Sequence, residues 1–153
     1  MQTSPEIDVA DALQKVLRGQ TLAALTHLPQ QQLEAVYAQA CYFVDREDFD
    51  SALDGLLYLV MHDPQDFRFQ FGYALCLHQL GSVTEAARHY GLAYMLDASD
   101  AGCAYRLGEC HESLGDAEAA AEAFRTAISL CSLPDAAPGL RVLAETGLDR
   151  LNG

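Results

Sequence analysis

Few basic residues and no tryptophan occur in this sequence, and the first shortage excludes several classes of partner. Nine Lys and Arg stand against 22 Asp and Glu, which gives a formal net charge of −13 over 153 residues. Such a surface repels phosphate backbones and anionic lipid headgroups at long range, so neither nucleic acid nor a membrane is an expected partner. Basic or apolar polypeptides remain suitable partners, because an acidic surface steers cationic segments inward.

Long apolar runs and export signals are also missing. No run of residues approaches the length of a membrane span, and residues 1–6 lack the basic and apolar regions of a signal peptide. The five cysteines are an odd number and contain no CxxC pair, which is typical of reduced thiols in a cytosol. We therefore expect a protein that stays in the compartment where it is made.

What the sequence does have favours helices. Half of the residues are hydrophobic, Ala and Leu are abundant, and β-branched residues are sparse. The length suits one domain with its own core, so residues 1–153 are predicted to form a single all-α domain.

A repeat of 34 residues runs through the chain, in the adjoining windows 33–66, 67–100 and 101–134. Small side chains recur at positions 8 and 20 of each window, where two helices can approach closely, and a bulky side chain recurs at position 24. We expect the bulky residues to lie in the core. In window order, the residues at positions 8, 20 and 24 are Ala40, Ala74 and Gly108; Ala52, Ala86 and Ala120; and Leu56, Tyr90 and Phe124.

Turn residues recur with the same period. Gly81 and Gly115 both fall at position 15, where a first helix can end in a left-handed turn. Ser82 begins a capping box for the following helix and Asp116 can cap its counterpart, whereas the first window has Glu47 in place of the glycine. Each window is therefore predicted to be a helix–turn–helix unit.

These features resemble the tetratricopeptide repeat, which implies a solenoid of three helix pairs. Residues 1–32 would then form N-terminal helices, with one face made by Ile7, Ala10, Leu13 and Leu17. Residues 135–153 would form a final amphipathic helix, marked by Leu140, Leu143 and Leu151, that covers the last repeat.

The same resemblance implies a concave wall built from positions 2, 5, 9, 12 and 13 of each repeat. Those positions give an aromatic and aliphatic trough with an acidic end, which suits an extended peptide that inserts apolar side chains. A clamp for a terminal carboxylate is not expected, because Tyr37 and Cys41 stand where that clamp needs Lys and Asn. The candidate groove residues are Tyr37, Cys41, Val44, Arg68, Phe71, Leu75, His78, Tyr105, Glu109 and Glu112.

Four segments give a more specific resemblance: residues 18–25 (RGQTLAAL), 33–38 (LEAVYA), Leu80-Gly81 and Glu109-Cys110-His111. Together with the order of the helices, they resemble the class II chaperones of type III secretion systems. The resemblance implies a cytoplasmic, ATP-independent bacterial chaperone that holds two hydrophobic, pore-forming translocator proteins before export, with a short client segment in the groove. It also implies a homodimer through the N-terminal face that contains Ile7 and Leu17, and, in some members, action together with a transcriptional regulator.

A general tetratricopeptide scaffold, a needle-subunit chaperone and a regulatory cofactor of the same secretion system remain alternatives. No cofactor or metal is predicted, because His111 points about 100° away from Cys110 on a helix and no His or Cys pair has the i, i+4 spacing of a two-ligand helix. No catalytic signature is present, so we do not expect an enzyme.

Overall fold

The structure is a computed structural model that describes residues 14, 15, 17–21 and 28–153. The longer of these ranges contains seven helices, and none of the described helices has the length and apolarity needed to span a bilayer. They are α3 (Gln30–Val44), α4 (Phe49–His62), α5 (Phe67–Gln79), α6 (Val83–Leu96), α7 (Ala101–Ser113), α8 (Ala117–Leu130) and α9 (Leu140–Asn152).

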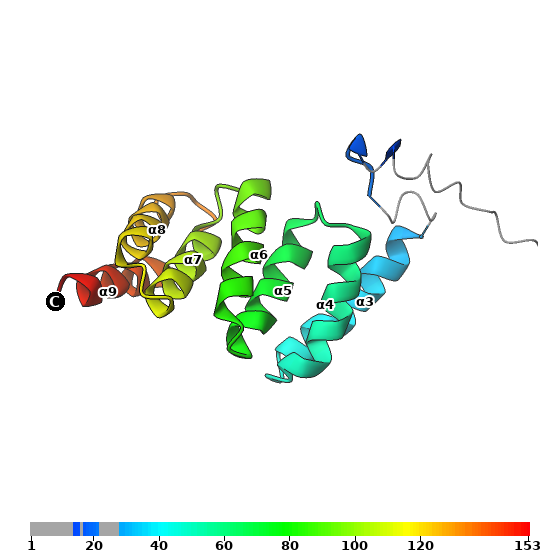
Figure 1. Cartoon of the computed structure of the whole chain (residues 1–153), viewed down its shortest axis with the longest axis horizontal. Coiled ribbons are helices and arrows are strands. Elements are labelled where there is room, and N and C mark those ends of the chain that lie inside the picture. Colours follow the sequence, from blue (N-terminus) through cyan, green and yellow to red (C-terminus); the bar gives the residue numbers. More distant parts are fainter. Residues whose placement is uncertain (1–13, 16, 22–27) are drawn as a thin grey trace, which may run out of the picture.

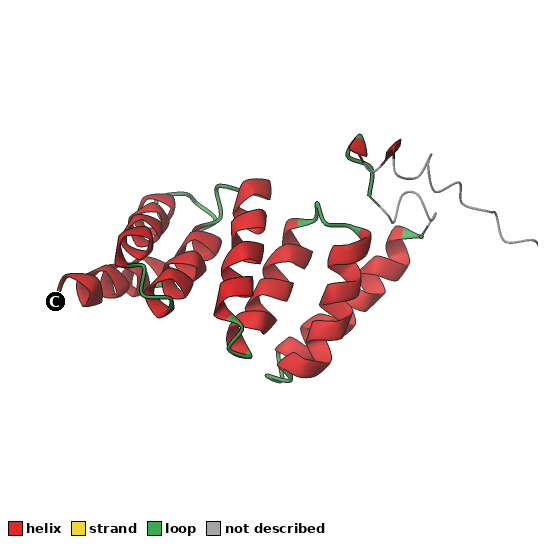
Figure 2. Ribbon diagram, viewed as in Figure 1, coloured by secondary structure: helices red, strands yellow, loops and turns green. Residues whose placement is uncertain are grey.

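The helices follow one another in a single file, from α3 at one end to α9 at the other (Figure 1). Each helix packs against the next, and α9 packs against both α8 and α7. Short loops join the helices (Figure 2). This is an all-α solenoid of three helix pairs with a terminal helix, and the predicted fold class is confirmed.

Aspartates begin most of the helices, and they recur with the period of the repeat. The carboxylates of Asp48 and Asp116 accept hydrogen bonds from backbone N–H groups three residues later, at 3.2 and 3.1 Å. Asp100 caps α7 in the same manner, and Asp66 caps α5 by accepting from the backbone N–H of Arg68, two residues later. Ser82 begins α6, but its side chain makes no capping hydrogen bond, so the predicted capping box is wrong there.

The turn between the helices of each pair uses the left-handed region. Gly81 and Gly115 have φ angles of 87° and 79°. Glu47 stands at the same repeat position and has a φ of 59°, which is uncommon for a residue with a side chain. The first turn therefore keeps the geometry of the other two without glycine, the residue that adopts a positive φ at no steric cost.

The core lies between the first and second helices of the repeats. Leu56, Tyr90 and Phe124 are at most 1% exposed, as predicted for position 24. Phe124 lies between two glycines, Gly108 of α7 and Gly147 of α9. A Cβ atom would come within 2.5 Å of the Phe124 ring at Gly108 and within 2.7 Å at Gly147. The absence of side chains at these two positions thus allows α7, α8 and α9 to meet around one ring.

One predicted helix face needs correction. Leu140 is buried in α9, but Leu143 is 52% exposed. The face that packs on α8 instead contains Leu140, Ala144, Leu148 and Leu151. Because an α-helix turns about 100° per residue, Leu143 lies about 60° to one side of Leu140, whereas Ala144, Leu148 and Leu151 lie about 20–80° to the other side.

Candidate peptide-binding groove

A pocket of ≈ 220 Å³ lies between α3 and α5. Most of its lining residues are apolar, and they include Leu56 of α4. It brings together six of the ten candidate groove residues: Tyr37, Cys41, Val44, Arg68, Phe71 and Leu75.

The helix register explains why these residues meet. Positions 5, 9 and 12 of the first repeat are Tyr37, Cys41 and Val44. They lie on one face of α3, because residues spaced by three and four share a side of a helix. The first helix of the next repeat presents its own positions 5 and 9, Phe71 and Leu75, to that face. Gly72 lies between them, and a Cβ atom there would come within 2.9 Å of Leu56 Cδ2. Gly72 therefore lets α5 approach Leu56, which is how a core residue comes to line the pocket.

Arg68 forms the polar edge of this pocket. Its guanidinium donates to both carboxylate oxygens of Glu34, at 2.7 and 3.1 Å, and to both of Asp66, at 2.7 and 3.1 Å. It also lies over the rings of Tyr37 and Phe69, 5.0 and 5.3 Å from their centroids. The hydrogen bond from Arg68 lowers the pKa of Glu34, and the two carboxylates raise the pKa of Arg68. These contacts hold the arginine in place as a fixed cation beside an apolar cavity.

Tyr37 and Cys41 are adjacent inside the pocket. Burial, followed by the neighbouring Cys41 thiol, raises the pKa of Tyr37 to about 12. The phenol therefore stays neutral at physiological pH and can donate a hydrogen bond beside the apolar residues of the pocket.

A second hollow of ≈ 310 Å³ continues from Phe71, which lines both pockets. Its lining includes Asp97, Asp100 and Asp135, residues that the sequence analysis did not single out. The loop after α8 folds back beside the start of α7 and brings Asp135 to the other two. This contact links residues about 35 positions apart, so no local pattern in the sequence could indicate it.

The four other candidate groove residues lie outside the ≈ 220 Å³ pocket. Tyr105 was expected to face the groove, but it is only 9% exposed and its ring packs against Phe124 at 5.8 Å. Its hydroxyl donates to Glu109 Oε1 at 2.8 Å, and Arg106 Nη1 donates to Glu109 Oε2 at 2.8 Å. The ring is thus mainly core, and Glu109 is already paired.

Glu112 is paired as well. Arg150 of α9 donates to its two carboxylate oxygens at 3.0 and 2.8 Å, which lowers the pKa of Glu112. The acidic end predicted for the trough is therefore partly neutralised at Glu109 and Glu112. The three unexpected aspartates supply acidic groups in the second hollow, which shares Phe71 with the apolar pocket.

His78 is half-buried beside Tyr90, with the two ring centroids 6.0 Å apart. Within the part of the chain that the structure describes, His78 Nδ1 and the Tyr90 hydroxyl are buried without a hydrogen-bond partner. Burial lowers the pKa of His78, so the imidazole is neutral at physiological pH. Unpaired buried polar atoms are unfavourable, which makes this the least satisfied part of the wall.

All five cysteines are free thiols. Burial raises the pKa of Cys76 to about 11 and those of Cys103 and Cys110 to about 12, so these three thiols are poorly reactive. Cys41 and Cys131 are half-buried. Of the two, only Cys41 lines the apolar pocket.

The predicted dimerisation face falls mostly outside the described residues. Ile7, Ala10 and Leu13 belong to the part of the chain that is not described. Leu17 is described and is 78% exposed. Dimerisation through this face stays a prediction.

Comparison with protein families finds two matches, both described as the tetratricopeptide repeat. One covers residues 37–102 and the other covers residues 101–132. Comparison with curated protein sequences finds no match.

Solved structures of similar architecture are numerous. A type III secretion system complex from Aeromonas hydrophila matches with a TM-score of 0.86 and 26% identity, over 93% of this chain and 95% of the other. PcrH, a Pseudomonas aeruginosa protein, was solved with the chaperone binding region of PopD; it matches with a TM-score of 0.77 and 26% identity, over 82% of this chain and 94% of the other.

The translocator chaperone SycD of Yersinia enterocolitica also shares the fold, with a TM-score of 0.76 and 21% identity, over 86% of this chain and 98% of the other. The resemblance inferred from four short segments of sequence is confirmed by these neighbours.

Proposed function

This chain belongs to the tetratricopeptide repeat family, and we propose that it is a chaperone that binds the hydrophobic translocator proteins of a type III secretion system in the bacterial cytosol before export. A polypeptide that later inserts into a membrane exposes apolar segments that would aggregate in water. A protein that covers such a segment keeps its client soluble without needing ATP.

The apolar pocket between α3 and α5 is the observation that carries this proposal. Tyr37, Val44, Phe71 and Leu75 line a cavity that can accept an apolar side chain from an extended client segment. Arg68, fixed by Glu34 and Asp66, lies where it can hydrogen-bond a backbone carbonyl of that segment. Apolar burial would supply most of the affinity, and the arginine would help to set the register.

The client class is proposed from the similar proteins. PcrH, at 26 and 27% identity, was solved in complex with the chaperone binding regions of PopD and of PopB. The two PcrH structures match most of this chain, which supports a client of the same kind. A binding solenoid with a peptide groove also supports a non-enzymatic role.

We further propose that the chain forms a homodimer through the N-terminal face that includes Leu17. Leu17, which belongs to the described part of the chain, is apolar and 78% exposed, so its side chain is available for a contact. Sedimentation of the full chain tests this point independently of client binding. A monomeric chain would contradict the proposed dimer and would leave the proposed role of the groove unaffected.

Co-expression tests the function directly. The full chain is expressed with each translocator protein of the same bacterium, and the soluble fraction is separated by size-exclusion chromatography with mass detection. A stoichiometric complex, with the translocator soluble only when the chain is present, is the expected result. If the chain is folded but every translocator stays insoluble and unbound, the general scaffold becomes the better interpretation.

Thiol labelling locates the client. Cys41 lines the pocket, whereas Cys131, also half-buried, lies at the end of α8 and serves as an internal control. We expect a bound translocator segment to slow iodoacetamide labelling at Cys41 and to leave labelling at Cys131 unchanged. Equal protection of both thiols, or of neither, would place the client elsewhere.

A further inference from the structure

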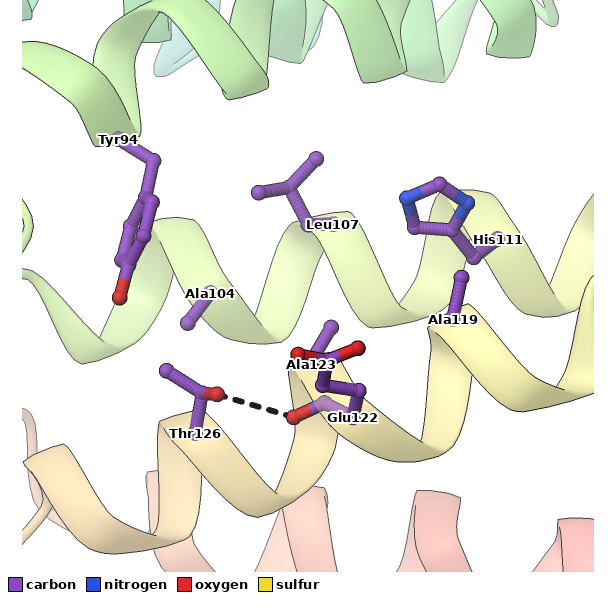
Figure 3. Close-up of a pocket in the computed structure, with 8 residues that line it drawn as sticks. All are labelled: Tyr94, Ala104, Leu107, His111, Ala119, Glu122, Ala123 and Thr126. Atoms are coloured by element: carbon purple, nitrogen blue, oxygen red, sulfur yellow. Dashed lines mark hydrogen bonds between the residues drawn. The ribbon is translucent and has the colours of Figure 1, made fainter.

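A pocket of ≈ 290 Å³ lies on another side of the solenoid, between α6, α7 and α8. It shares no residue with the peptide-binding groove. Figure 3 shows Tyr94 and His111 at its two ends, with Leu107 between them and the α8 side chains opposite. Its floor is made by three alanines, Ala104, Ala119 and Ala123.

Comparison with the preceding repeat explains why this pocket is open. One repeat earlier, the positions of Leu107 and Ala123 are held by Tyr73 and His89. Those two rings pack edge to face with their centroids 4.8 Å apart, and His89 Nδ1 donates to Gln70 Oε1 at 2.8 Å. In the third repeat a leucine and an alanine replace the two rings, so the same space between helices is left unfilled.

The charge at this place is also reversed between the two repeats. Glu122 occupies the position that Arg88 holds one repeat earlier. Figure 3 shows the Glu122 side chain among the residues that line the pocket, on the α8 side. No ion pair of Glu122 is formed among the described residues. The pocket thus combines an apolar floor, an aromatic ring and a carboxylate, in a chain of net charge −13.

We infer that this pocket is a second interaction site, which receives an arginine side chain of a basic polypeptide partner. The aliphatic stem of the arginine would lie on the alanine floor, and its guanidinium would stack near Tyr94 and pair with Glu122. The chain contains an internal precedent: Arg68 pairs with Glu34 and lies 5.0 Å from the centroid of the Tyr37 ring. Charge complementarity selects arginine over the neutral aromatic side chains that fill the space in the preceding repeat.

Titration of the ¹⁵N-labelled full chain with N-acetyl-arginine methylamide tests this inference by NMR. Binding with a Kd on the order of millimolar is expected for so small a ligand, with shifts concentrated at α7 and α8 around Ala104 and Ala123. The neutral isostere N-acetyl-citrulline methylamide should produce much smaller shifts. Equal shifts from both probes would overturn the charge pairing, and shifts spread over the acidic surface would overturn the site.

Matched variants sharpen the result. Glu122→Gln should weaken arginine binding by about tenfold or more, because a charged hydrogen bond is lost. Glu118→Gln removes an exposed acid one helical turn away, outside the pocket lining, and should leave the binding unchanged. Similar losses in the two variants would mean a general effect of negative charge and would overturn the inference.

Two further measurements test the polypeptide partner. The acetylated and amidated peptide Ala-Ala-Arg-Ala-Ala should bind at least as tightly as the single residue; weaker binding would show that a chain cannot deliver its arginine here. Sedimentation of the Glu122→Gln variant should match the unchanged protein. A shift in oligomeric state would identify a second copy of this chain as the occupant and overturn the proposal of a separate partner. Both measurements are independent of the translocators.

Discussion

The junction between the first two repeats and the junction between the last two differ in the face that carries an apolar pocket. The first has its pocket in the peptide-binding groove, between α3 and α5. Its other face is filled by Tyr73 and His89. At the second junction, the pocket with an apolar lining lies instead between α6, α7 and α8, and the hollow on the groove side is lined by three aspartates. The backbone register is the same at both junctions, so side-chain size at a few positions decides which face can bind.

On the groove side, three substitutions in register account for the difference. Moving 34 residues along the chain replaces Leu56 by Tyr90, Val44 by His78 and Gly72 by Arg106. Each replacement is larger, and each is polar. The second junction is therefore occupied by side chains of the protein itself where the first leaves an apolar cavity.

The largest predicted effect comes from making the second junction resemble the first. Tyr90→Leu should lower the free energy of unfolding by about 2–4 kcal/mol, because the buried ring contacts Phe71 and His78 and its loss leaves a cavity. Urea denaturation of the purified chain measures this. A loss below about 1 kcal/mol would mean that the neighbouring helices collapse into the space.

Tyr90→Phe is the control for that experiment. The Tyr90 hydroxyl is buried and has no partner among the described residues, and the third repeat already has Phe124 at this position. Removing an unpaired buried hydroxyl should leave stability unchanged or raise it by up to about 1 kcal/mol. A clear loss would show that the hydroxyl has a partner in solution.

The second prediction concerns client affinity and uses two tyrosines of α3. Tyr37 lines the pocket, whereas Tyr42 is 53% exposed and does not line it. Tyr37→Ala should weaken translocator binding by about 2 kcal/mol, and Tyr42→Ala should have little effect. Fluorescence anisotropy with a labelled client segment measures both.

Phe71→Ala is a poorer test of the same point. Its ring stacks on Phe67 at 5.6 Å and contacts Tyr90 edge to face at 5.4 Å, so the variant would lose core packing as well as client binding. Equal affinities of the Tyr37→Ala and Tyr42→Ala variants would place the client outside this pocket.

The sequence predicts most of this architecture and part of the site, for identifiable reasons. Period, capping residues and small residues such as Gly108 are local signals, and they indicate helix pairs correctly. Six groove residues meet as expected because each follows from helical spacing. Tyr105 was misplaced because its burial depends on Phe124, and the pairing of Glu112 with Arg150 depends on where α9 packs. Such contacts between elements carry no periodic signal.

A smaller effect is expected at the turns, where the first repeat differs from the other two. Glu47→Gly should raise stability by up to about 1 kcal/mol, because glycine adopts a φ near 59° without strain but loses more backbone entropy on folding. Gly81→Ala, at the same position of the second repeat, should lower stability by about 1 kcal/mol. Thermal unfolding of both variants measures the difference, and a destabilised Glu47→Gly variant would mean that the Glu47 side chain makes a favourable contact.

The smallest predicted effect separates two arginines, Arg68 and Arg150, each of which pairs with a glutamate of another helix. Arg68 is held by two carboxylates and two aromatic rings, whereas Arg150 pairs with Glu112 alone among the residues that the structure describes and has a side chain that is 51% exposed. Solvent screens such a pair, so Arg150→Ala should change the free energy of unfolding by no more than about 0.5 kcal/mol, and Arg68→Ala should cost more. Urea denaturation at low salt and at 0.5 M NaCl compares the variants, and salt should reduce the small effect of Arg150→Ala further. An Arg150→Ala loss as large as that of Arg68→Ala would show that the pair with Glu112 fixes α9 against α7, and that the last repeat depends on this contact with the terminal helix for its stability.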